Sequence, residues 1–234
     1  MNYPLYIFFG LAPSIVWLLF YLKKDVHPES NSMILKIFGY GMLAAIPTAI
    51  IELGALKSLE LISLPPVFTM GLICFLGVAL PEEMMKYLVV RAKVLSNPEL
   101  DEPIDVMLYM IICALGFAGL ENILVLFPFG GIFEFFTVSW IRFIGATFLH
   151  ALCAGLIGYF LALSFLKTEK RVQLTIIGLG SAIVLHGLYD FFIIIEGSLK
   201  LAGPTIILVG LAIFVSYGFK KVKKIKSVCL FSKN

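Results

Sequence analysis

Residues 64–90 read LPPVFTMGLICFLGVALPEEMMKYLVV, an apolar run that contains three charged residues. A membrane-spanning helix needs about 20 predominantly apolar residues, so this run is long enough to cross a bilayer. Glu82, Glu83 and Lys86 lie inside it, and each costs about 2.5–3.5 kcal/mol at the bilayer centre on insertion scales. Such groups occur inside a span when they meet in a polar cavity and act there. The run therefore predicts a transmembrane helix that carries part of a functional site.

Six further apolar runs extend this prediction to the whole chain. Of the 234 residues, 60% are hydrophobic, and the mean hydropathy is +1.01; soluble domains contain about 45–50% apolar residues. We predict an all-α, polytopic membrane protein with about seven transmembrane helices around a polar intramembrane cavity. It should form a single integral membrane domain over 1–234, with the motif-bearing core at about 64–196. The predicted spans are 3–22, 34–52, 64–90, 104–127, 138–165, 174–195 and 203–219.

Basic residues concentrate on one side of the predicted membrane. Of the 18 Lys and Arg residues, 14 lie on the inner side if the N-terminus is outside, and Lys86 lies within a span. The outer side carries Lys57, Arg142 and Lys200. The positive-inside rule therefore predicts a multi-pass plasma-membrane protein with its N-terminus outside and its C-terminus cytoplasmic. We expect the lipid bilayer as a partner and no nucleic acid; the basic stretch 220–226 is interpreted as a stop-transfer anchor.

The acid pair and the lysine of the third span share one helical face. Glu82 and Lys86 are four residues apart and Glu83 and Lys86 are three apart, so Lys86 can bond either carboxylate. Pro81 should kink the helix at this point, and an irregular backbone at this depth must line protein or water. Adjacent carboxylates repel in a low dielectric. One group can then accept a proton while the other holds one, which suits general acid–base catalysis; the alternative is an ion-paired kink without chemistry.

Four more ionisable residues lie in the next three spans: Glu121, His150, His186 and Asp190. Glu121 has no basic residue within a helical turn, so it needs a proton or a partner on another helix. The spacing of His186 and Asp190 predicts that Asp190 holds one imidazole nitrogen and leaves the other for chemistry. The role of His150 is open between a simple hydrogen-bonding group and a member of the site.

Three motifs resemble a known family: Glu82-Glu83-x-x-Lys86, Phe117-x-x-x-Glu121 and His186-x-x-x-Asp190, in that order on the third, fourth and sixth predicted spans. They are similar to those of the PrsW family of bacterial intramembrane proteases, which is related to the CAAX prenyl endopeptidases and bacteriocin-immunity membrane proteases. The resemblance covers about 80–195. It implies a glutamate-dependent protease that makes the first, site-1 cut in a single-span anti-sigma factor during a stress response. The related prenyl endopeptidases have histidine where this chain has Glu121, and His150 could take up part of that role.

We therefore expect hydrolysis of a peptide bond by water activated on a carboxylate. Glu83 is the expected general base, Glu82 positions the water, and Lys86 orients the pair. His186, held by Asp190, would polarise the scissile carbonyl. Glu121 and His150 would complete the cavity wall and could protonate the leaving amine.

Other mechanisms and functions remain open from the sequence. Four acids against Lys86 alone leave an excess of three negative charges, which held protons, protonated histidines or a metal must offset. We expect no metal or other cofactor; zinc is the alternative, because the carboxylates and histidines could coordinate it with an open position. The chain contains no GxSxG and no HExxH motif. The alternative functions are a proton-coupled transporter and a CAAX-type or immunity membrane protease with another substrate.

Overall fold

The computed structural model describes residues 3–24, 27–128, 132–197 and 199–225, and within these ranges it contains helices and no strand. The segments are α1 (Tyr3–Leu22), α2 (Asn31–Glu60), α3 (Pro66–Leu72), η1 (Ile73–Ala79), α4 (Leu80–Lys93), α5 (Pro103–Leu126), α6 (Ile132–Ile144), α7 (Ala146–Leu166), η2 (Thr168–Lys170), α8 (Arg171–Ile194) and α9 (Leu199–Lys223). They form seven candidate membrane spans. The all-α prediction with seven spans is confirmed.

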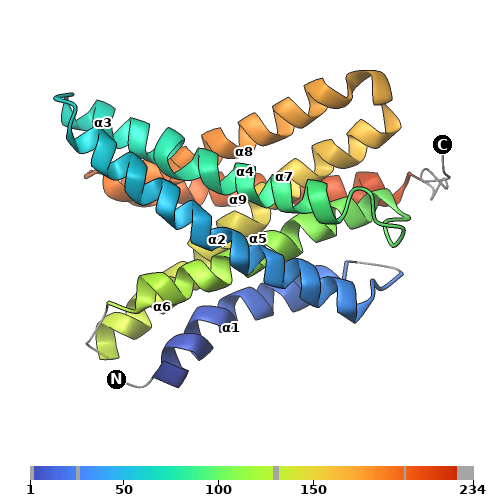
Figure 1. The fold of residues 1–234 in the computed structure, drawn as a ribbon, viewed down its shortest axis with the longest axis horizontal. Coiled ribbons are helices and arrows are strands. Elements are labelled where there is room, and N and C mark those ends of the chain that lie inside the picture. The colour runs from blue at the N-terminus through green and yellow to red at the C-terminus, as the bar shows by residue number, and fades with distance from the viewer. Residues whose placement is uncertain (1–2, 25–26, 129–131, 198, 226–234) are drawn as a thin grey trace.

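Helix α5 is the centre of the bundle. Nearly all of its residues are buried, and it packs most extensively against α7, α2 and α1 (Figure 1). The surrounding helices instead expose large apolar side chains such as Phe8, Leu35 and Ile206. In a bilayer these side chains face lipid, and polar groups must be satisfied inside the bundle. The functional groups are therefore expected on the faces turned toward α5.

Two glycines bring α2 and α5 into backbone contact. A Cβ added to Gly41 would lie 2.0 Å from the backbone oxygen of Cys113, and one added to Gly116 would lie 2.0 Å from that of Phe38. No larger residue fits either place without separating the helices, which is why small residues favour close packing of membrane helices. This contact fixes α2 against the central helix.

The third span is interrupted by a π-helical segment, η1. The backbone N–H of Leu80 bonds to the oxygen of Phe75, five residues earlier, in place of the α-helical partner four residues earlier. Pro81 follows within the first turn of α4 and lacks an N–H. The irregular backbone expected at Pro81 thus takes the form of a π segment just before it. Glu82, Glu83 and Lys86, in the first two turns of α4, are all buried.

The fifth span consists of two helices. The sequence predicts one helix over 138–165, but α6 ends at Ile144 and α7 begins at Ala146. Gly145, between them, has the backbone angles φ −94° and ψ −90°, which are not helical. The hydroxyl of Tyr189 would lie 2.3 Å from a Cβ at Gly145, so this break packs closely against α8.

Basic residues gather at one end of the bundle. The connections α1–α2, α4–α5 and α7–α8 lie at this end, as does the end of α9, whereas α1 begins at the opposite end (Figure 1). The described basic residues at these positions are Lys23, Lys24, Arg91, Lys93, Lys167, Lys170, Arg171, Lys220, Lys221, Lys223 and Lys224. The last residue of the basic stretch, Lys226, lies outside the described residues. The charge asymmetry is present in the fold, and its cytoplasmic assignment remains a prediction.

Candidate active site

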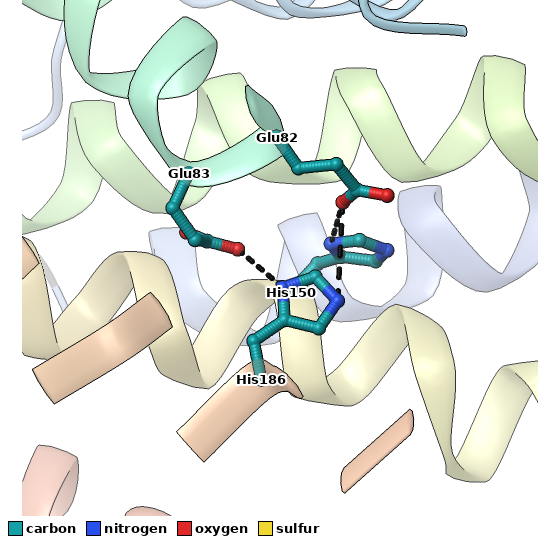
Figure 2. Close-up of side chains that lie close together, drawn as sticks. All are labelled: Glu82, Glu83, His150 and His186. Carbon is teal, nitrogen blue, oxygen red and sulfur yellow. Dashed lines mark hydrogen bonds and ion pairs between the residues drawn. The ribbon is translucent and has the colours of Figure 1, made fainter. Parts of the chain in front are cut away.

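Four buried side chains from three helices converge at one point. Glu82 and Glu83 come from α4, His150 from α7 and His186 from α8, and Figure 2 shows the two imidazole rings facing the two carboxyl groups. Each of the four offers one atom to a group in which all atoms lie within 4.8 Å of one another. The structure thus joins residues that are up to 104 positions apart in the sequence.

The ammonium group of Lys86 lies among these side chains. Its Nζ donates to Glu82 Oε2 at 3.1 Å and to Glu83 Oε1 at 2.8 Å, so the predicted contacts with both glutamates are confirmed. It also lies 2.8 Å from His150 Nδ1. The ring of Phe117, the aromatic residue of the second motif, lies 4.5 Å from Nζ. A buried ammonium needs this many partners because it has lost its hydration.

The contacts of His150 define its tautomer. A charged lysine can only donate, so His150 Nδ1 must accept from Lys86 Nζ. The proton of the neutral ring then lies on Nε2, which is 2.7 Å from Glu121 Oε2 and donates to it. His150 therefore connects the buried lysine to a third carboxyl group. The geometry places His150 in the cluster of buried ionisable groups, and its role in the chemistry stays a prediction.

Glu121 finds its cation on another helix. Arg142 was expected among the outer-side cations, but it lies in α6, within the fifth span. Its Nη2 is 2.7 Å from Glu121 Oε1, an ion pair whose angles fall outside those of a hydrogen bond. Its Nε donates to Asn122 Oδ1 at 2.6 Å. Sequence reasoning missed this role because Arg142 has no motif around it and no neighbour in sequence that reveals its partner.

Asn122 extends this contact to two more helices. Its Nδ2 donates to the backbone oxygen of Gly10 in α1 at 3.2 Å and to Thr147 Oγ1 in α7 at 3.0 Å. Asn122 is itself buried, and so is Thr147. The Arg142 contact therefore ties α6 to the buried polar groups of α1, α5 and α7.

The main partner of His186 differs from the prediction. Its Nδ1 lies 2.7 Å from Glu83 Oε1, whereas its Nε2 lies 3.5 Å from Asp190 Oδ2 in an ion-pair contact without a hydrogen bond. Nε2 is also 3.9 Å from Glu82 Oε2. The predicted His186–Asp190 hydrogen bond is thus wrong: the wholly buried Glu83 orients the ring from α4, and Asp190 lies farther out on the other side of it.

A further acid joins the site, so the charge excess persists. Glu52 of α2 lies beside Glu82, and no motif in the sequence marks it. The inner charges are now five carboxyl groups (Glu52, Glu82, Glu83, Glu121 and Asp190) and two cations (Lys86 and Arg142). Five minus two again leaves three excess negative charges if all are ionised and the histidines are neutral. Protons or another cation must still offset them.

The imidazole and carboxylate groups of the cluster are of the types that bind zinc. The ammonium group of Lys86, however, already contacts three of these four side chains. Two imidazoles and two carboxylates are typical zinc ligands, and Glu83 Oε2 is buried with no hydrogen-bond partner. However, Lys86 Nζ lies 2.8–3.1 Å from atoms of Glu82, Glu83 and His150. A divalent cation bound by these residues would require the ammonium group to move away or lose its proton.

Glu121 and Asp190 form the exposed edge of the site. Both side chains are 26% exposed, whereas those of Glu82, Glu83, Lys86, His150 and His186 are at most 4% exposed. Glu121 and Asp190 are therefore the members of the site that lie nearest the molecular surface. A membrane-embedded enzyme with an enclosed acid–base centre is the class of protein that this fold and site describe.

Comparison with known proteins agrees with this class. The family model described as PrsW family intramembrane metalloprotease matches residues 29–217. The chain belongs to the PrsW family of intramembrane proteases, and the predicted resemblance to this family is confirmed. The match extends beyond the motif region, from the loop before α2 to within α9.

Relatives in several bacteria carry the name Protease PrsW. That of Geobacillus kaustophilus (strain HTA426) is 31% identical over 186 residues, which cover 79% of this chain and 78% of the relative. That of Bacillus subtilis (strain 168) is 29% identical over 222 residues, 94% of each chain. No solved structure shows a significant match. The family supports a peptidase in the membrane over the transporter alternative.

The Arg142–Glu121 pair should support both stability and activity. Arg142→Met leaves Glu121 and Asn122 Oδ1 without their cationic partner, so the free energy of unfolding should fall by roughly 1–3 kcal/mol. Cleavage should fall as well. Arg142→Lys keeps the charge but cannot contact both residues as a fork, so its loss should be smaller. Thermal unfolding in detergent, with the exposed Lys36→Met as control, measures the effect; equal stability of Arg142→Met and Lys36→Met would contradict it.

Proposed function

We propose that this protein hydrolyses a peptide bond of a single-span membrane protein, an anti-sigma factor, with water activated on a carboxylate. The observation that carries the proposal is the buried contact of Glu82 and Glu83 with Lys86 and His186, in a chain of the PrsW family. Paired carboxyl groups in a low-dielectric site can divide the roles of proton acceptor and proton holder. A structural ion pair alone would not need two histidines on other helices.

Glu83 is the proposed general base. Its Oε1 is held by Lys86 and His186, while its Oε2 has no hydrogen-bond partner and can accept a proton from water. The hydroxide so formed attacks the carbonyl carbon, and Glu82 positions the water. His186 Nε2 lies between Glu82 and Asp190. Because Nδ1 donates to the carboxylate of Glu83, Nε2 carries a proton as well only in the imidazolium form of the ring. In that form Nε2 can donate a hydrogen bond to the developing oxyanion, which stabilises the transition state.

The leaving amine needs a proton when the carbon–nitrogen bond breaks. A chain of contacts leads from Glu83 through Lys86 and His150 to Glu121. Groups in such a chain can pass a proton between the buried base and the more exposed end of the site. Glu121, at the more exposed end, is proposed to protonate the leaving amine. His150 Nε2 then supplies Glu121 with the proton that has passed along the chain from Glu83. Glu82, Glu83, Lys86, Glu121, His150 and His186 thus each have a proposed role.

The proposed substrate class rests on the exposed edge of the site, at Glu121 and Asp190, and on the resemblance to the PrsW family. Glu121 and Asp190 lie at the accessible side of a site enclosed by membrane helices, which favours entry of a peptide segment from within or at the edge of the bilayer. The resemblance implies an anti-sigma factor with one membrane span, cut at its first site. Purified protein mixed with candidate anti-sigma factors in liposomes tests this proposal. Cleavage of soluble peptides alone, and of no membrane-spanning substrate, would contradict it.

The acid pair gives the most direct test of mechanism. Glu83→Gln keeps the size of the side chain but removes the base, so the rate of cleavage should fall by at least about 100-fold, while the substrate still binds. Glu82→Gln should be nearly as severe. Glu134→Gln, an exposed acid of α6, is the matched control and should cleave normally. Thermal unfolding checks that the variants fold. Full cleavage by Glu83→Gln would reject Glu83 as the base.

Zinc is the alternative to a metal-free site. Glu82, Glu83, His150 and His186 would hold it, and it would supply Lewis-acid activation of water. We favour the metal-free site because Lys86 already provides a positive charge at the centre of the same donors. Extensive chelation should therefore leave an active protein with far less than one metal per chain by elemental analysis. Loss of activity that one equivalent of zinc restores would contradict this expectation.

Lys86→Met provides a second readout for the same question. Removal of the ammonium group frees the centre of the donor set, so zinc content should rise toward one per chain while cleavage is lost. A wild-type protein that already carries one zinc, with no increase in Lys86→Met, would show that the lysine does not compete.

The proposed location is the bacterial plasma membrane, with the N-terminus outside and the C-terminus cytoplasmic. The gathering of basic residues at one end of the bundle supports this orientation. A reporter fused to the C-terminus should be active only in the cytoplasm. A reporter inserted at the turn near Gly197, between α8 and α9, should be active only outside. Both reporters on the same side would contradict the seven-span topology.

A further inference from the structure

A cavity of about 490 Å³ lies away from the active site, at the basic end of the bundle. It lies between the end of α4, the end of α7 and the start of α8. Arg91, in the last turn of α4, and Arg171, the first residue of α8, both line it. Its volume is within the range of small-molecule sites, roughly 300–1,000 Å³. The mechanism described above uses neither arginine.

Arg91 and Arg171 line the same cavity, and neither has an anionic partner among the described residues. Among the described residues, no carboxylate forms an ion pair with Arg91 or Arg171. Glu169 lies in the neighbouring turn but does not line the cavity. The Cζ atom of Arg171 lies 5.3 Å from the centre of the Phe165 ring. This cation–π contact fixes the position of the guanidinium group. Two like charges at one hollow repel each other unless an anion lies between them, and arginine pairs favour phosphate because its oxygens match their forked donors.

The other lining residues combine polar and apolar side chains, as expected of a site for an amphiphilic molecule at the membrane surface. Ser96 also lines the cavity and offers a hydroxyl group, and Tyr87, Phe165 and Ile176 form apolar walls. The candidate spans end at Lys93 and Leu166 and begin again at Thr168, so the arginines lie at the level where helices leave the hydrocarbon core. Lipid phosphates occupy this level, and anionic lipids attract basic residues there.

We propose that this cavity binds a phosphate group, supplied by the headgroup of an anionic phospholipid, between Arg91 and Arg171. The apolar walls, which a free phosphate would not contact, favour the lipid as the source. Acyl chains would lie along the exposed apolar face of α8, where Val172 and Ile176 follow Arg171. The proposal is independent of the proposed protease mechanism.

Binding of short-chain lipids to the purified full-length protein tests the site. Dioctanoyl phosphatidylglycerol, dioctanoyl phosphatidylcholine and glycerol 3-phosphate are titrated in neutral detergent, with thermal unfolding and native mass spectrometry as readouts. We expect saturable binding of phosphatidylglycerol that weakens at least tenfold in Arg91→Gln/Arg171→Gln. Lys167→Gln/Lys170→Gln removes the same charge from the same end without touching the cavity, and it should change the affinity by less than twofold. Arg171→Gln alone, an exposed position, keeps the test available if the double variant does not fold, with at least a threefold loss.

The three titrated compounds distinguish a lipid headgroup from a free phosphate ester as the source of the phosphate. Binding of phosphatidylglycerol without glycerol 3-phosphate assigns the site to a lipid headgroup; competition by glycerol 3-phosphate assigns it to phosphate from either source. Wild-type affinity in the arginine variants, or an equal loss in the lysine control, would overturn the proposal, because binding would then reflect general surface charge.

Discussion

The burial of one ammonium group organises the centre of this protein. Lys86 has no exposed side-chain surface, and its Nζ contacts two carboxylates, an imidazole and an aromatic ring. An ion removed from water without such partners would cost several kcal/mol. The partners come from α4, α5 and α7, and Glu83 in turn holds His186 of α8. Packing of these helices and assembly of the site are therefore a single event: neither is favourable without the other.

Local features of the site were predictable from sequence, and contacts between helices were not. Lys86 bonds Glu82 and Glu83 because residues three and four apart share a helical face, and the spans follow from apolar length. The partner of Glu121 could not be found in this way. Arg142 lies 21 positions away on a separate helix, and only the break at Gly145 and the packing of α6 bring the two together.

The same distinction explains the error at His186. The i, i+4 spacing made Asp190 the obvious partner, and the two groups are indeed neighbours. A nearer acid on α4 takes the hydrogen bond instead, because the π segment and Pro81 set the position of that helix. Glu52 was missed because it is the last residue of the predicted span 34–52, where a single acid is typical of the end of a span. Its position beside Glu82 is visible only in the structure, in which α2 continues to Glu60.

The π segment before the acid pair has a consequence for how this site can vary. Each π-type bond encloses one more residue than an α-type bond, so η1 holds its extra length as a local insertion. Removal of a single residue between 73 and 79 would let the span run as a regular α-helix. Because the π turns already absorb the extra residue, the helix after them would keep nearly the same orientation relative to α3, and the two glutamates and the lysine would still face α7 and α8. Removal of a residue from the regular α-helical turns on either side would instead turn the acid pair by about 100° relative to what precedes it, so chains that share this site should tolerate the loss of one residue within 73–79 better than in those turns.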